Sequence, residues 1–269
     1  MVEPKKQNGL SVKDLTVSLN NQNFLLQGIS HHFTQGAMTV ILGPNGVGKS
    51  SLLQCLANIH KTSNAVFLNE QPVTSLAASH QLAQQLAYLP QQSQLSFPLQ
   101  VSEVIDMGFM PHALNLADKQ AFLQQASAIG RIANLLDRNY TQLSGGEQAR
   151  VQLARVVAQV LPALADNKQQ TTVLLLDEPV AALDIAIQHK VLESLKALCE
   201  QGLTLVVVLH DINLAMRYAD EVIMLKSGQL WQAGDPLDVI NEAAIEAIYG
   251  VKSQFICVPC LEQPVIIFN

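Results

Sequence analysis

The sequence predicts an α/β fold with a parallel core sheet, an antiparallel β segment before it and a helical segment inserted into it. Three observations lead to this prediction. Continuous apolar runs of strand length occur at 172–176 and 203–209, as in parallel strands buried on both faces. A glycine-rich stretch at 43–50 joins an apolar strand to a helical pattern. The middle third is rich in Gln, Ala and Leu, with apolar residues at helical spacing.

Composition limits the class of protein. The chain has 269 residues, 49% hydrophobic and 14% charged, which supports a packed core and excludes disorder. A formal net charge of −6 argues against a nucleic-acid partner. No apolar run reaches the roughly 18 residues of a membrane span. The polar stretch 1–9 does not resemble a secretory signal, and four cysteines are too few for a disulfide scaffold, so we expect a cytoplasmic protein.

Each element follows from the hydrophobic period, in chain order. Apolar stretches at 10–19 and 24–33 predict two antiparallel strands, and Met38–Leu42 predicts a third that stops at Gly43. Helical spacing then predicts helices at 49–58, 77–87, 101–110, 118–130 and 147–160. Ser102 and Asp118 are the expected N-caps in this segment, and Gly130 suits a helix end.

The last third alternates strands and helices again. Its expected elements are strands at 172–176 and 203–209, a helix at 186–199, a hairpin of 221–225 and 229–233, and a helix at 242–249 that ends at Gly250. No linker separates independent domains. We therefore expect one domain over 1–269, with a core of 1–87 and 161–269 and a helical subdomain of 88–160.

The loop at 43–50 fits G-x-x-x-x-G-K-[S/T] and lies between a strand and a helix. Its backbone N–H groups can converge on phosphate, Lys49 can reach the β- and γ-phosphates, and the Ser50 hydroxyl can ligate Mg²⁺. An ordinary glycine-rich turn is the alternative, which this context disfavours. The predicted nucleotide-binding residues are Gly43, Pro44, Asn45, Gly46, Val47, Gly48, Lys49, Ser50 and Ser51.

Two carboxylates follow the strand at 172–176, at the end where α/β sheets bind ligands. Asp177 would hold Mg²⁺, and Glu178 would act as general base toward the attacking water. Taken alone, an acidic pair here is equally typical of a helix N-cap, so the argument depends on the loop at 43–50. Together the two motifs predict a P-loop NTPase with a RecA-like core.

A second phosphate-binding loop opens the helix that runs to residue 160. Glycine N–H groups at a helix N-terminus again form an anion site. Since the chain has two such loops and one P-loop lysine, we expect two half-sites, each completed by a second copy of the chain. The residues of this loop are Leu143, Ser144, Gly145, Gly146, Glu147 and Gln148.

With GPNGVGKS, LSGGEQ, VLLLDEP, Ala-Leu-Asp at 182–184 and His210 in this order, the whole chain resembles the ATP-binding subunits of ABC transporters. The resemblance implies a homodimer that sandwiches two ATP molecules with Mg²⁺, the P-loop of one subunit facing Ser144 of the other. It also implies two polytopic permease subunits that this dimer drives by ATP hydrolysis.

Single residues acquire roles from the same resemblance. His210 matches the residue that contacts the γ-phosphate, and Asp184 matches the one that crosses the dimer interface. Gln91 matches the glutamine that links Mg²⁺ and the attacking water to the helical subdomain, with Gln92 as the alternative. Many family members stack an aromatic ring on adenine where this chain has Leu19, and Phe24 nearby is either its substitute or a strand core residue. Val180-Ala181 replaces the family's Thr-Ser, a loss that should not disable the site.

A finer resemblance concerns the stretches 96–98, 101–108, 138–142 and 149–155, which are similar to the ATP-binding subunits of bacterial haem importers. Siderophore-iron and cobalamin importers share much of this pattern, and a soluble ABC-type ATPase of iron–sulfur assembly is a second class. The resemblance implies a peripheral subunit on the cytoplasmic face of the inner membrane, with 97–110 toward the permease and a periplasmic substrate-binding protein as an indirect partner.

Two further motifs favour simple interpretations. Cys257 and Cys260 form a lone C-x-x-C without a second ligand pair, which argues against zinc or redox function. His31-His32 is interpreted as an exposed pair on a strand.

Overall fold

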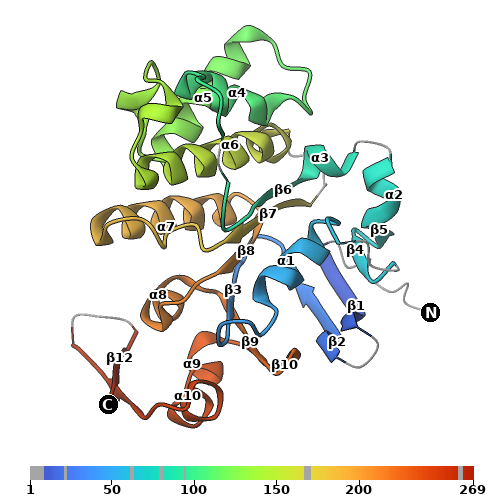
Figure 1. The fold of residues 1–269 in the computed structure, drawn as a ribbon, viewed down its shortest axis with the longest axis vertical. Coiled ribbons are helices and arrows are strands. Elements are labelled where there is room, and N and C mark those ends of the chain that lie inside the picture. Colours follow the sequence, from blue (N-terminus) through green and yellow to red (C-terminus); the bar gives the residue numbers. More distant parts are fainter. Residues whose placement is uncertain are drawn as a thin grey trace.

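The computed structural model describes residues 9–20, 23–60, 64–78, 81–93, 95–166, 171–259 and 263–269. Its centre is a six-stranded sheet in the order β10-β9-β3-β8-β7-β6 (Figure 1). All neighbouring pairs are parallel except β9 and β10. The strands are β3 (Met38–Leu42), β6 (Leu86–Leu89), β7 (Thr172–Asp177), β8 (Leu203–Val208), β9 (Glu221–Lys226) and β10 (Gln229–Gly234). The predicted parallel core is confirmed.

Burial on both faces explains the continuous apolar runs. Side chains of one strand alternate between two hydrophobic clusters: Val40 and Leu42 of β3 pack with the helical side, and Ile41 between them packs with the other. On the first face lie α6 (Gly145–Ala165), α7 (Ile185–Glu200), α8 (Ile212–Tyr218), α9 (Pro236–Val239) and α10 (Glu242–Tyr249). On the second lie α1 (Lys49–Leu56) and the N-terminal sheet.

The N-terminal sheet has four strands in the order β2-β1-β4-β5. β1 (Leu10–Asn20) and β2 (Asn23–Phe33) form the predicted antiparallel pair, and the short β4 (Val66–Leu68) and β5 (Gln71–Pro72) extend it. The expectation of an exposed His31 is wrong. Its ring is largely buried against Phe33, and its Nε2 lies 3.3 Å from Oε1 of Glu221 on β9, so the side chain contacts the central sheet.

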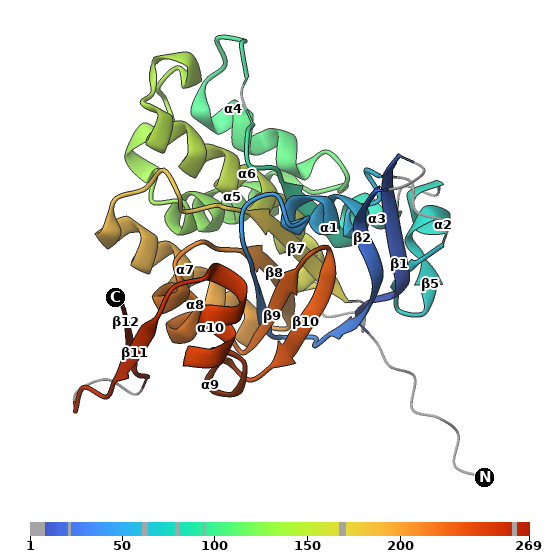
Figure 2. The ribbon, with the colours of Figure 1, turned by 60° about the horizontal axis from the view of Figure 1, so that its bottom comes forward.

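The inserted segment is helical, as predicted, and its helices gather at one end of the molecule, with α6 packed against the sheet (Figures 1 and 2). It contains α4 (Val101–Asp106), α5 (Leu116–Ile129) and most of α6. The N-caps differ from the prediction, because Gln100 and Asn115 precede these helices and Asp118 donates its backbone N–H to the Asn115 side chain. Ser102 lies inside α4.

The predicted helix at 77–87 is wrong. The structure has two short helices, α2 (Val73–Ala78) and α3 (Gln81–Gln85), followed by β6. Strand pairing overrides the local propensity here, since Leu86 to Leu89 lie in parallel register with Val173 to Leu176 of β7.

The C-terminal part follows the prediction closely. β9 and β10 form the expected hairpin, and α10 ends at Gly250, whose φ of 72° is left-handed. The tail adds a hairpin of β11 (Ser253–Ile256) and β12 (Val265–Phe268), which was not predicted. None of the helices in the described residues combines the length and the apolar character that a bilayer span requires.

Candidate nucleotide-binding and active site

The loop at 43–50 leaves β3 and enters α1, as predicted. Gly43 has a φ of 150°, and a Cβ built on it would lie 2.6 Å from the carbonyl oxygen of Leu225. Gly46 also has a positive φ, of 77°, but its Cβ would meet nothing within 4 Å. Gly43 is therefore required by space as well as by backbone angle, whereas Gly46 is required by angle alone.

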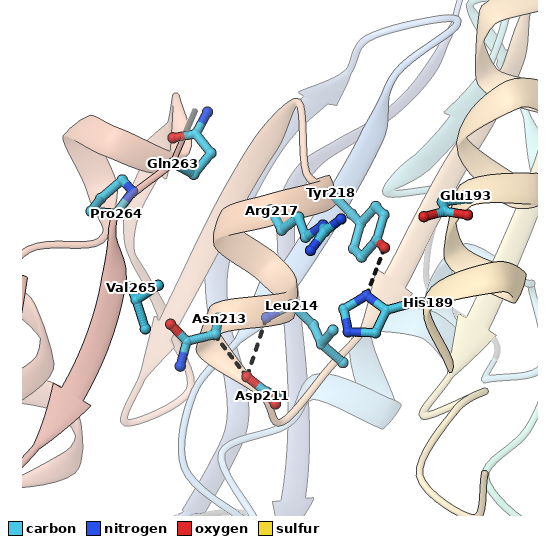
Figure 3. Close-up of a pocket in the computed structure, with 10 residues that line it drawn as sticks. All are labelled: His189, Glu193, Asp211, Asn213, Leu214, Arg217, Tyr218, Gln263, Pro264 and Val265. Carbon is cyan, nitrogen blue, oxygen red and sulfur yellow. Dashed lines mark hydrogen bonds between the residues drawn. The ribbon is translucent and has the colours of Figure 1, made fainter. Parts of the chain in front are cut away.

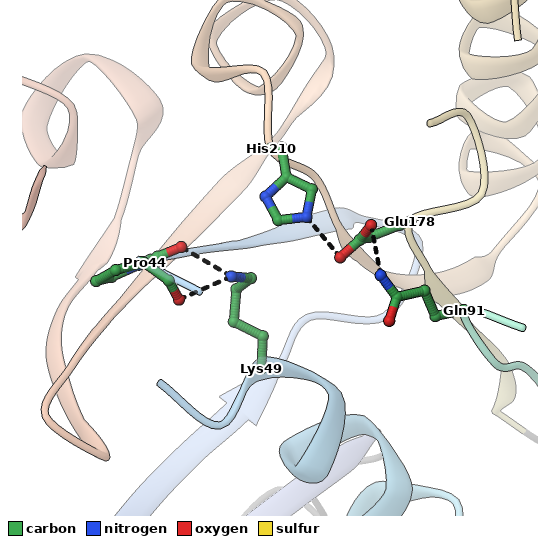
Figure 4. A network of polar contacts seen from close by, with 6 residues as sticks. Pro44, Lys49, Gln91, Glu178 and His210 are labelled. Carbon is green, nitrogen blue, oxygen red and sulfur yellow. Dashed lines mark hydrogen bonds and ion pairs between the residues drawn. The ribbon is translucent and has the colours of Figure 1, made fainter. Parts of the chain in front are cut away.

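The Lys49 side chain is buried within this loop. Its ammonium donates to the carbonyl oxygens of Gly43 at 2.8 Å and Pro44 at 3.0 Å (Figure 4). Burial lowers the pKa of Lys49, against the opposing effect of the nearby carboxylates of Glu178 and Asp177. Because the ammonium is bonded to carbonyls at the mouth of the loop, phosphate oxygens can replace these acceptors.

Asp177 lies at the end of β7 and is only 2% exposed. Burial is the main cause that raises its pKa, and a hydrogen bond with the Ser50 side chain opposes it. Its Oδ1 is buried and has no hydrogen-bond partner among the described residues. An orphaned carboxylate oxygen beside a hydroxyl is a donor set that suits a hard divalent cation.

Glu178 follows directly, with a left-handed φ of 53° and a side chain only 13% exposed. Its Oε1 lies 2.5 Å from Nε2 of His210, and its Oε2 accepts a hydrogen bond of 2.9 Å from Nε2 of Gln91 (Figure 4). The structure thus brings together three residues that lie at 91, 178 and 210 in the sequence. Of the two candidate glutamines, it is Gln91 that contacts Glu178.

A cleft of about 460 Å³ connects these groups with the loop. It is lined by Leu25, Asn45, Gly46, Gly48, Lys49, Ser50, Ser51, Gln91, Glu178 and His210. A larger cavity of about 640 Å³ lies between α7, α8 and residues 263–265 (Figure 3). None of the predicted site residues lines it, so the smaller cleft is the candidate nucleotide site.

The motif at 143–148 forms a capping box at the start of α6. Ser144 Oγ accepts from the Glu147 N–H, and Ser144 donates its own N–H and O–H to Glu147 Oε2 at 2.9 and 2.8 Å. These bonds hold the pKa of Glu147 below its usual value. The S-x-x-E spacing in the sequence is the signal for this box, and the anion-site interpretation had overlooked it.

Asp184 caps α7 through a 3.0 Å hydrogen bond from the N–H of Ile187, and it is exposed. The next residue, Ile185, is 74% exposed. The side chains of Leu19 and Phe24, the candidates for adenine stacking, lie outside the described part of the structure, as does Cys260. Cys257 is an exposed free thiol.

Tyr249 is a residue near the site that the sequence analysis missed. Its hydroxyl, at the end of α10, is hydrogen-bonded to the backbone of Gly43, and burial raises its pKa. The C-terminal helix therefore supports the P-loop. Nothing in the local sequence marks this contact, because more than 200 residues separate the two positions along the chain.

Known proteins are similar to this chain in sequence and in fold. The family profile described as "ABC transporter" matches residues 26–181. The hemin import ATP-binding protein HmuV of Plesiomonas shigelloides is 36% identical over 90% of this chain and 95% of its own length. HmuV of Shewanella denitrificans is 37% identical over 96% of this chain and all of its own length. The dimeric structure of a bacterial ABC transporter cassette superposes with a TM-score of 0.71 at 25% identity, covering 84% of this chain and 98% of that one. These matches and the shared α/β architecture show that the chain belongs to the ABC transporter family, as one of its ATP-binding cassettes.

Proposed function

We propose that this chain is the ATP-hydrolysing subunit of a membrane importer and that the imported substrate is haem. The observation that carries the catalytic part is the pairing of Glu178 with His210 and Gln91 at the mouth of the P-loop cleft. Two polar side chains from distant parts of the chain, His210 and Gln91, meet at the carboxylate of Glu178 beside a phosphate-binding loop. That arrangement suits hydrolysis of a nucleoside triphosphate.

Each residue has a role in this reaction. The loop 43–51 binds the phosphates, and Lys49 exchanges its carbonyl partners for β- and γ-phosphate oxygens. Glu178 takes the proton of the attacking water as general base. His210 holds one oxygen of Glu178 and orients the base, and it would contact the γ-phosphate of a bound nucleotide. Ser50, Asp177 and Gln91 would hold Mg²⁺, which neutralises phosphate charge when bound.

The second half of each site comes from another copy of the chain. The Leu143–Gln148 loop carries a helix N-terminus and no lysine, which supports a role in completing the site of a second copy. The family resemblance adds Asp184 to the interface between the two copies. The helical subdomain, residues 88–160, then moves with the nucleotide state and transmits it to two membrane permease subunits. The cassette is peripheral, on the cytoplasmic face of the inner membrane, and meets a periplasmic binding protein only indirectly.

The cargo follows from the relatives. Proteins 36–37% identical over most of this chain are named hemin import ATP-binding proteins. The permease and the binding protein select the cargo. The similarity of this cassette to hemin import cassettes therefore supports haem only because similar cassettes are expected to serve similar partners. Siderophore-iron and cobalamin are the competing cargoes.

The catalytic proposal is tested by Glu178→Gln in the full-length chain. Steady-state ATP turnover should fall about 10²-fold or more, the usual scale for a lost general base, while ATP binding is kept. Lys49→Ala is the matched variant, which should weaken binding itself. Near-normal turnover in Glu178→Gln would show that another group activates the water.

The cargo is tested by deleting the gene for this chain and restoring either the wild type or Glu178→Gln. The deletion strain should not grow with haem as its iron source, and only the wild type should restore growth. Growth on haem in the deletion strain, with loss of siderophore-iron or cobalamin uptake, would overturn haem as the cargo. Loss of iron–sulfur enzyme activity with normal uptake would favour the assembly class.

A further inference from the structure

We propose that Gln152, on α6, is a positioning residue that ties the segment carrying Gln91 to the segment carrying Ser144. The proposal rests on the proposed function, because both of those residues belong to the proposed catalytic site. Gln152 lies on the buried face of α6 and is only 2% exposed. An amide buried this deeply must have all its polar atoms paired.

The amide of Gln152 is paired on both sides. Its Oε1 accepts from the Ser93 hydroxyl at 3.2 Å and from Nε of Arg155 at 2.8 Å, and its Nε2 donates to the Tyr140 hydroxyl at 3.0 Å. The amide atom beside Arg155 must be the oxygen, because a guanidinium can only donate hydrogen bonds. Ser93 and Tyr140 therefore contact opposite ends of one side chain.

The Ser93 end leads to the catalytic base. Ser93 lies two residues after Gln91, whose side chain donates to Glu178. Gln91, Ser93, Gln152 and Glu178 line one small cavity of about 200 Å³. If Gln91 moves toward or away from Glu178, Ser93 moves with it, and Ser93 is the residue that Gln152 holds by a hydrogen bond.

The Tyr140 end leads to the capping box. Tyr140 is fully buried, and its backbone carbonyl accepts from the N–H of Leu143 at 3.2 Å and from Nε2 of Gln148 at 3.2 Å. The two donors, Leu143 and Gln148, lie before and after Ser144 in the chain, so Tyr140 holds both ends of the segment that carries Ser144. Since buried hydrogen-bond networks resist partial rearrangement, Gln152 makes the two segments move as one unit within a subunit.

The test is a double-mutant cycle on ATP hydrolysis by the full-length chain. Ser93→Ala and Tyr140→Phe each remove one hydroxyl, and their side chains are joined only through Gln152 in the contacts described above. Each should lower kcat about 3- to 10-fold, the scale of one buried hydrogen bond. The KM for ATP should stay within about twofold, because neither hydroxyl lines the P-loop cleft. The double variant should lose no more than the worse single variant, because the link is already broken.

Two further variants separate positioning from simple packing. Gln152→Glu keeps all three contacts, since a carboxylate accepts from Ser93, Arg155 and the Tyr140 hydroxyl, and it should retain kcat within about threefold. Gln152→Leu should lose about as much as the double variant. Ser127→Ala is the control and should match wild type, because among the described residues the buried Ser127 hydroxyl bonds to the Gln124 carbonyl of its own helix α5.

The role of Gln152 would be overturned if the double variant lost the product of the two single-variant losses in kcat. It would also be overturned if Ser93→Ala behaved like the control Ser127→Ala. Glu178→Gln is measured in parallel to separate this from the proposed function. If Glu178→Gln is inactive and the cycle is additive, only the role of Gln152 fails. If Glu178→Gln is active, the catalytic assignment fails and the positioning role fails with it.

Discussion

Gly43→Ala tests whether the P-loop has the geometry described here. Its added Cβ would lie 2.6 Å from the Leu225 carbonyl oxygen and 3.1 Å from Cγ1 of Val47, and the oxygen belongs to the backbone of the central sheet. Forcing an L-residue into the left-handed region costs about 1–2 kcal/mol, and overpacking adds about 1–3 kcal/mol. The free energy of unfolding should therefore fall by about 2–5 kcal/mol.

Gly46→Ala is the matched variant in the same loop. Its φ is also positive, but the added methyl meets nothing within 4 Å, so it should cost only the backbone term of about 1–2 kcal/mol. Urea denaturation at 25 °C, followed by circular dichroism, measures both. Equal destabilisation by the two variants would refute the argument that Leu225 closes the space at Gly43.

Three further predictions concern other parts of the chain. Ser144→Arg should abolish ATP hydrolysis while the chain stays folded and binds ATP; hydrolysis by monomers with a specific activity independent of concentration would refute the shared site. Burial raises the pKa of Cys55 to about 11 and of Cys199 to about 12, so at pH 8 iodoacetamide should label Cys257 and spare both, as peptide mass spectrometry can check. Because the pKa of Glu147 is lowered on folding, its charge stabilises the fold above about pH 4.3 and loses this effect as the pH falls through the lowered pKa. The loss of stability in Glu147→Gln should therefore be largest at pH 7 and shrink steadily as the pH falls below about 4.3, and a loss that does not change with pH would contradict the capping box.

The core of the fold and the position of the P-loop could be predicted because their signals are local. A buried parallel strand needs a continuous apolar run, and the loop 43–50 needs its glycines and its lysine in consecutive positions. β6 could not be predicted, since Leu86 to Leu89 follow helical segments and become a strand only by pairing with β7. The same holds for His31, which is buried by Glu221 of a distant strand.

The site divides in the same way. The sequence proposed candidate residues for the site, and three of them, Gln91, Glu178 and His210, meet in space. It could not predict how they meet, or that Tyr249 supports Gly43, because these contacts join segments far apart in the chain. The capping box of Ser144 and Glu147 was predictable from spacing alone and was missed because the glycines favoured an anion site.

The closure of two copies of this chain around ATP, followed by reopening when Glu178 promotes hydrolysis, is the step on which the proposed function depends. It is tested most directly by light scattering on Glu178→Gln with and without ATP. We predict that Glu178→Gln has the 29.2 kDa mass of one chain without nucleotide and twice that mass with ATP and Mg²⁺, while wild type returns to the single-chain mass as ATP is consumed. A Glu178→Gln protein that stays monomeric in saturating ATP would contradict it.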